Sequence, residues 1–247
     1  MKQKNNISAL CFCACVLMCI NFNACTKQSF NTSKHTQKVI QTNAASILSI
    51  EGIADVFFVE DSLDFCIISG TEAIVDAVSI TQTNNCITMS NTTKWYATKN
   101  YEKPQVYIHA SCVDTVYIHE ACNFSTLRPI TRCMYMYMNA YVSSISVEID
   151  APSFLFTTWN KAGGEFEFYG TCTTARMQAA YTSKINAENL KTKTMYVTNN
   201  SIQDFVVWAC DSLIAHTTKQ GCVLYKGSPI VHAKYEGTNV LMYFNDE

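Results

Sequence analysis

The chain has 247 residues and a formal charge of −2, and only 15% of its side chains are charged whereas 48% are hydrophobic. This length is sufficient for one hydrophobic core, and the sequence has no basic stripe of the kind that binds nucleic acid. We therefore expect no nucleic acid among its partners, and a surface covered by Thr, Asn, Ser and Gln rather than by ion pairs.

The first 24 residues have the pattern of an export signal. Lys2 and Lys4 precede an apolar run, residues 7–20, that is interrupted only by Ser8. A short basic segment before such a run is typical of signal peptides, and the run is shorter than the ~20 apolar residues that span a bilayer as a helix. The cysteine cluster CFCAC lies inside this run, so we interpret it as part of the hydrophobic segment and not as a metal or redox motif.

Cys25 follows this signal directly. Ala24 stands before it, as in the lipobox of bacterial lipoproteins, where the cysteine is acylated and becomes the first residue of the mature protein, although Phe22 stands where Leu is usual. We expect lipidation at Cys25 and attachment to a membrane through that lipid. The alternative is that Cys25 only ends a cysteine-rich signal that is cut elsewhere.

Residues 25–44 are predicted to form a flexible tether. They are polar, unperiodic and rich in Thr, Gln, Asn and Ser, so they cannot bury enough apolar area to offset the cost of ordering them. Thr26 occupies the position where Asp often marks retention in the inner membrane. This favours the outer membrane of the cell envelope and leaves open whether the protein faces the periplasm or the surface. Without residues 1–24 the chain has 16 basic and 20 acidic residues, a formal charge of −4.

Eight of the thirteen cysteines remain once those of the signal and Cys25 are set aside. An even number in an exported protein permits disulfides, but most of these cysteines lie in apolar strand patterns, where cysteine behaves as a small hydrophobic residue. We favour free, buried thiols. No CxxC pair remains, so we expect neither a structural zinc site nor a cofactor. The eight are Cys66, Cys86, Cys112, Cys122, Cys133, Cys172, Cys210 and Cys222.

Almost every segment of residues 45–247 has the pattern of a β-strand. The segments are short, rich in β-branched and aromatic residues, and separated by Gly, Asn, Asp, Ser or Pro, as in ADVFFVE, QVYIHA, MYMYM and GEFEFYG. No stretch shows a sustained helical period. The sequence therefore predicts one all-β domain over residues 45–247.

A turn-like triplet recurs in the second half at intervals of 20, 20, 19, 19 and 18 residues, each time before an apolar strand. A period near twenty predicts a β-solenoid, in which each coil covers the inner face of its neighbour. A sandwich or barrel also has regularly spaced turns, but we favour the solenoid because the interval varies so little. The triplets are centred on Tyr141, Lys161, Tyr181, Asn200, Lys219 and Gly237.

Residues 46–244 resemble a known family. The matching elements are Gly52-Ile53 before the strand DVFFVE, a second strand that ends at Gly70, the helical or turn segment EAIVDAV, the strand CITMS, the pair in QVYIHASCVDTVYIHEAC, and YKGSPIV near the end. They are similar to the domain of unknown function numbered 2807, the head GIN domain of auto-transporter adhesins, found in Bacteroidota lipoproteins. The resemblance implies a right-handed β-helix with a small N-terminal β region and a role in adhesion.

Two groups of residues could carry catalysis or metal binding. His109 and His119 recur in YIHA and YIHE and could stack on neighbouring strands with Glu120 as metal ligands, but without a third fixed ligand we favour polar strand positions and expect no metal site. Parallel β-helices also include polysaccharide lyases and glycosidases, which require paired carboxylates. Glu148, Asp150, Glu165 and Glu167 lie on adjacent predicted coils, but a solvated strand face is the better interpretation, so we expect no enzyme and no catalytic residue.

Aromatic residues recur along the predicted coils and are the best candidates for a binding surface. Tyr141 and Tyr181 occupy the same place in two coils, and Trp159 lies between them. Exposed aromatic residues stack on sugar rings or serve as hot spots for proteins, whereas buried ones only pack the core. We therefore predict a membrane-anchored, non-enzymatic β-solenoid lipoprotein that binds a glycan or a protein; the alternative is a β-helix carbohydrate-active enzyme.

Overall fold

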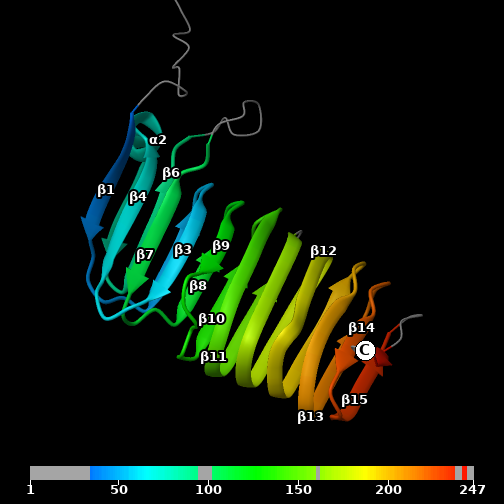
Figure 1. The fold of residues 1–247 in the computed structure, drawn as a ribbon. Coiled ribbons are helices and arrows are strands. Elements are labelled where there is room, and N and C mark those ends of the chain that lie inside the picture. The colour runs from blue at the N-terminus through cyan, green and yellow to red at the C-terminus, as the bar shows by residue number, and fades with distance from the viewer. Residues whose placement is uncertain (1–33, 94–101, 160–161, 237–240, 244–247) are drawn as a thin grey trace, which may run out of the picture. The chain divides into compact units, whose positions relative to one another are not determined.

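The computed structural model describes residues 34–93, 102–159, 162–236 and 241–243. They form a β-solenoid of about 6 turns with a repeat of about 21 residues, which confirms the predicted fold class (Figure 1). The described helix, α2 (Glu72–Ala77), lies in the predicted segment EAIVDAV. The strands are β1 (His35–Gln41), β2 (Ile47–Glu51), β3 (Asp55–Glu60), β4 (Phe65–Thr71), β5 (Val78–Thr83), β6 (Cys86–Asn91), β7 (Gln105–Ala110), β8 (Thr115–Ile118), β9 (Asn123–Thr126), β10 (Met134–Met138), β11 (Ser143–Thr158), β12 (Gly163–Ser201), β13 (Phe205–Thr217), β14 (Val223–Lys226), β15 (Ile230–Tyr235) and β16 (Leu241–Tyr243).

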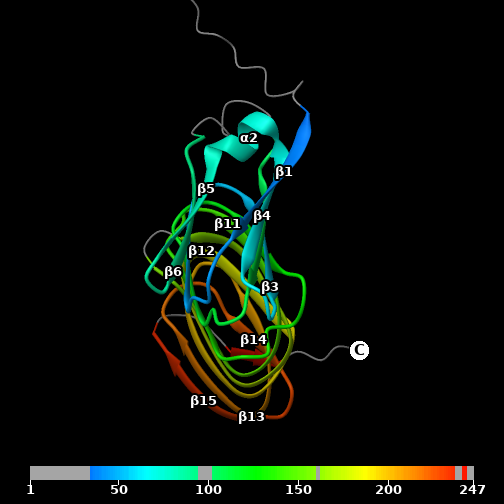
Figure 2. The same cartoon turned by 90° about the vertical axis from the view of Figure 1, so that its left-hand side faces the viewer.

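Each coil contributes strand to two faces that meet at two corners. Hydrogen-bonded neighbours on the first face follow the order β1-β4-β7-β3-β9-β11, and those on the second face follow the order β5-β6-β2-β8-β10-β11. Strand β11 serves both faces, because it pairs with β9 through Ile145 and with β10 through Phe156. Viewed along the stack, the coils lie behind one another as loops (Figure 2).

The core follows from strict alternation of side chains along the strands. In β11 and β12 every second residue is buried over long stretches, as the two-residue period of a strand requires. Phe154 and Phe156 on the second face meet Phe166 and Phe168 on the first face, with ring centroids 4.8–5.3 Å apart. The interior is therefore a packed column of apolar side chains shared by successive coils.

The coils become shorter toward the C-terminus. Ser143 pairs with Gly164, 21 residues on, whereas Ser212 pairs with Ile230, 18 residues on. The pairing of β12 with β13 contains register shifts that absorb the difference near a corner, after Ala187. The interval between triplets decreases along the sequence because the later coils contain fewer residues.

Antiparallel pairs and a helix close the N-terminal end. β1 pairs antiparallel with β4, β4 with β7, and β5 with β6, while α2 connects β4 to β5 and buries Ile74 and Val75. Such a cap is needed because the first coil of a solenoid has no neighbour to cover its apolar interior. This is the predicted small N-terminal β region.

The order of the coils in space differs from their order in the sequence. β2 lies between β6 and β8, and β3 lies between β7 and β9. The connection from β7 to β8 therefore crosses the coil that β2 and β3 form.

The predicted tether is partly wrong. Residues 35–41 form β1, whose seven residues all pair with β4, from His35 opposite Thr71 to Gln41 opposite Phe65. Only Ile40 of β1 packs against the core, so backbone pairing rather than apolar burial orders this polar segment. Residues 25–33, with Cys25 and the predicted signal before it, lie outside the described residues.

Candidate binding surface

The three aromatic residues predicted as a surface lie at the same corner, where the chain passes from the second face to the first. Tyr141 is 76% exposed, Trp159 52% and Tyr181 51%. Val142 and Ile202 are also exposed there, on the same corner of their coils. We call these five residues the aromatic edge.

Buried serines fix the backbone beneath the aromatic edge. Ser183 Oγ donates to Ala162 O, and Ser201 Oγ lies 2.7 Å from Ser183 O and 2.9 Å from Tyr181 O. Both serines are fully buried. Tyr181 itself has a φ of 60°, a left-handed conformation that is uncommon for a residue with a side chain. Side-chain hydrogen bonds between coils thus hold this corner in place.

An aromatic ladder on the second face leads to the edge. The ring centroids of Tyr117 and Tyr137, which are directly paired on β8 and β10, are 5.2 Å apart, and those of Tyr137 and Trp159 are 5.4 Å apart. His119 lies beside Tyr117 at 6.0 Å. Tyr117 was not singled out in the sequence, although its place 20 residues before Tyr137 is a usable signal.

His109 and His119 do not come together. His109 lies on the first face, where its Nδ1 is 3.0 Å from Asp61 Oδ2 and its ring stacks on Phe65 at 4.1 Å. The hydrogen bond from His109, with another from the Ser62 N–H, holds the pKa of the Asp61 carboxyl below its usual value. His119 follows β8 on the second face. Within the described ranges no group of three or more His, Cys, Asp or Glu side chains could hold a metal ion.

The four carboxylates considered for catalysis are spread over the first face. Glu165 pairs with Lys184 at 3.8 Å and lines a hollow of about 400 Å³ beside Val142. Asp150 accepts a hydrogen bond of 2.6 Å from Thr171 and lines a different groove, of about 690 Å³, at the other corner. Glu148 and Glu167 lie on the strands between these two corners. The four side chains therefore do not line one cleft.

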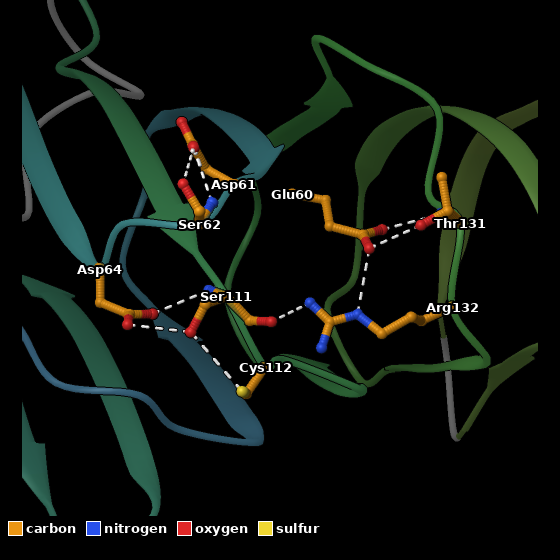
Figure 3. Close-up of polar contacts among 8 residues, drawn as sticks. All are labelled: Glu60, Asp61, Ser62, Asp64, Ser111, Cys112, Thr131 and Arg132. Carbon is orange, nitrogen blue, oxygen red and sulfur yellow. Dashed lines mark hydrogen bonds and ion pairs between the residues drawn. The ribbon is translucent and has the colours of Figure 1, made fainter.

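A polar network surrounds the connection that crosses the β2–β3 coil (Figure 3). Glu60 accepts hydrogen bonds of 2.7 Å from the backbone and the hydroxyl of Thr131 and one of 3.0 Å from Arg132. Arg132 also donates to the carbonyl of Ser111, whose N–H and hydroxyl bind Asp64. Each carboxylate accepts two or more hydrogen bonds from protein donors, so this network holds the crossing in place.

The eight cysteines of the domain are all free in the structure, as predicted, but only Cys66, Cys122 and Cys172 are buried. Burial raises the pKa of the Cys66 and Cys122 thiols to about 12 and that of Cys172 to about 11. Cys112 and Cys133 are exposed. The three buried cysteines thus act as small apolar residues of the core.

The sequence matches one family model, over residues 46–229, whose description is "Putative auto-transporter adhesin, head GIN domain". No curated protein matches the sequence. The described part of the chain contains no helix that is long and apolar enough to cross a membrane.

Solved structures from related bacteria share the fold. A "putative adhesin" from Bacteroides fragilis superposes with a TM-score of 0.71 at 14% identity, covering 85% of this chain and 97% of its own. A "putative adhesin" from Parabacteroides merdae gives 0.60 at 15% identity, covering 87% and 98%. A "putative lipid binding protein" from Parabacteroides distasonis gives 0.62 at 14% identity, again covering 87% and 98%. At this identity the likeness concerns the fold alone.

Proposed function

Because this chain belongs to the head GIN domain family of auto-transporter adhesins, we propose that it is an adhesion module that binds a macromolecule, glycan or protein, through the aromatic edge and catalyses no reaction. The observation that carries this proposal is the position of Tyr141, Trp159 and Tyr181. A folded protein rarely leaves several large aromatic side chains exposed along one line unless they meet a partner.

The architecture supports a binding role in a second way. The aromatic side chains lie on regular coils whose backbone is fixed by the interior serines, so little conformational freedom remains to be lost when a ligand binds. The candidate carboxylates do not line one cleft, which a glycosidase would require.

Binding is tested with the full chain on a glycan array and in a pull-down from cell envelopes. We expect the variant Tyr141→Ala/Trp159→Ala to lose most of the captured ligand. Tyr243→Ala is the matched control, because Tyr243 is an exposed aromatic residue on β16, which pairs with β14 on the first face and not at this corner. Equal capture by all three proteins would contradict the proposal, and so would cleavage of a bound glycan.

The proposed attachment to the outer membrane depends on Cys25. The lipidated chain should partition with membranes and carry the mass of a diacylglyceryl group and a further acyl chain. Cys25→Ser should remove both properties, whereas Cys112→Ser, which changes an exposed cysteine of the domain, should remove neither. A Cys25→Ser chain with unchanged mass and partitioning would refute the anchor. Protease treatment of intact cells would then show whether the domain faces the surface.

A further inference from the structure

Resting on the proposed function, we infer that the ligand of the aromatic edge is a carbohydrate, and that one sugar ring stacks on the free face of the Trp159 indole. The argument begins with the aromatic ladder. Rings that stack along a solenoid cover one another's faces, so Tyr117 and Tyr137, with an interplanar angle of 18°, offer only their edges to a ligand.

The ladder stops at Trp159. One face of the indole is turned toward Tyr137, and on the next coil the adjacent position is Ala180, whose N–H donates to Thr158 Oγ1 at 3.2 Å. Alanine has no side chain that could extend the ladder. Trp159 is 52% exposed, and because Ala180 is too small to cover an indole, we place the sugar ring on the side of Trp159 that is turned away from Tyr137.

Polar side chains lie on the coil next to Trp159 and on the coils beyond it. Gln178 is exposed and pairs with Thr157, two residues before Trp159. Farther along the same corner, Thr218 donates to Asn200 Oδ1 at 2.7 Å. Tyr181 follows Ala180 directly and adds a second exposed ring. An aromatic platform with amides and hydroxyls beside it matches a ring that has an apolar C–H face and hydroxyl groups at its rim.

A protein partner fits this surface less well. Stable protein interfaces bury about 800 Å² on each side around a continuous apolar centre. Here the exposed apolar residues follow one narrow line, and the positions between them hold small or polar side chains such as Thr182. The line follows the stack, so several units of an extended glycan could contact successive coils.

The test uses the full chain, titrated with the neutral oligosaccharides that score highest on the glycan array, and Kd is measured by calorimetry. We expect Trp159→Ala to weaken binding ~tenfold or more, and Trp159→Phe to retain part of the affinity. Trp208→Phe is the control, since Trp208 lies between Lys191 and Lys226 on the first face.

The decisive variant is Ala180→Phe, which keeps Trp159 and fills the space on its side that is turned away from Tyr137. We expect it to abolish oligosaccharide binding while the circular dichroism spectrum and the unfolding midpoint stay close to those of the parent chain. Wild-type affinity in a folded Ala180→Phe chain would overturn the stacking position.

The same experiments separate this inference from the proposed function. If no glycan binds but an envelope protein is captured through Trp159, the carbohydrate assignment is wrong and the binding role of the edge stands. If neither glycan binding nor protein capture depends on the aromatic edge, both the carbohydrate assignment and the proposed binding role are wrong.

Discussion

Arg132 Nε lies 3.0 Å from Glu60 Oε1, and this contact joins the end of β3 to the segment that leads into β10. The guanidinium also donates to Ser111 O in the connection from β7 to β8. One ion pair thus connects three segments that are distant in sequence, at the place where the chain crosses its own first coil. Val113 anchors the crossing segment in the core, and the charged network holds its polar residues.

The first prediction concerns the pH dependence of stability. Burial raises the pKa of the Glu60 carboxyl, but the hydrogen bonds from Thr131 and Arg132 outweigh it and hold the pKa below the usual value of 4.5. The folded state therefore favours the ionised form. The stabilisation is present above that usual value and is lost as the pH falls through the folded-state pKa.

Glu60→Gln should remove this acid-dependent part and cost about 1–3 kcal/mol near neutral pH, because Arg132 loses its charged partner. Urea unfolding between pH 3 and 7 measures both effects. The control is Glu167→Gln, a change on an exposed strand position. An unchanged pH profile for Glu60→Gln would show that the network does not stabilise the crossing.

The second prediction concerns the serine beneath the aromatic edge. Ser201→Ala removes the hydroxyl that donates to Ser183 O at 2.7 Å and accepts from the N–H of Gln203 at 3.1 Å, so we expect a loss of about 1–3 kcal/mol in the free energy of unfolding. Ser144→Ala, on an exposed position of β11, should cost less than about 0.5 kcal/mol. Equal unfolding midpoints for the two variants would argue against a role for the buried hydroxyl.

The third prediction concerns Gly164 in β12. Its φ of 135° is unfavourable for other residues, and a Cβ at this position would overlap the carbonyl oxygen of Ser143 on the preceding coil. Gly164→Ala should therefore destabilise the chain by about 1–3 kcal/mol. A thermal unfolding scan measures the change. An unchanged melting temperature would mean that neighbouring coils can move apart at Gly164 without a loss of stability.

The fourth prediction concerns thiol reactivity. Thiolates react and thiols do not, so Cys66 and Cys122, with pKa values raised to about 12, should resist a maleimide reagent at pH 8, while exposed Cys112 and Cys133 react first. Peptide mass spectrometry after timed labelling gives the order. In urea all four should react alike. Labelling of Cys122 as fast as Cys112 in the folded protein would contradict its burial.

The sequence was sufficient to predict the solenoid because its evidence is local. Alternation in segments such as GEFEF predicts strands with one buried and one exposed face, and the nearly constant spacing of the triplets centred on Tyr141, Lys161 and Tyr181 predicts one coil per interval. The same spacing predicts that both tyrosines lie at one corner. Their exposure could not be deduced, because a turn residue can point inward or outward.

Two features could not be predicted, for different reasons. β1 has a polar sequence and is ordered by backbone hydrogen bonds to β4, which carry no side-chain signature. The crossing of the β7–β8 connection over the β2–β3 coil could not be predicted from the sequence, because all strands have the same alternation of apolar and polar residues and could pair with one another. The corner between β7 and β8 places His109 and His119, ten residues apart in similar segments, on different faces.

The chain enters the described domain at its capped N-terminal end, through the antiparallel strand β1. If the chain is anchored through Cys25, the anchor precedes β1 in the chain, and each coil after β1 lies farther along the solenoid from that strand. Five spacings between neighbouring strands, each about 4.8 Å, separate β1 from β11 on the first face. The aromatic edge, which begins beside β11, therefore lies roughly 24 Å from β1 along the stack. The number of coils that precede Trp159 thus sets the distance along the solenoid from β1 to the aromatic edge, and coils added after it would change only the length available for contact.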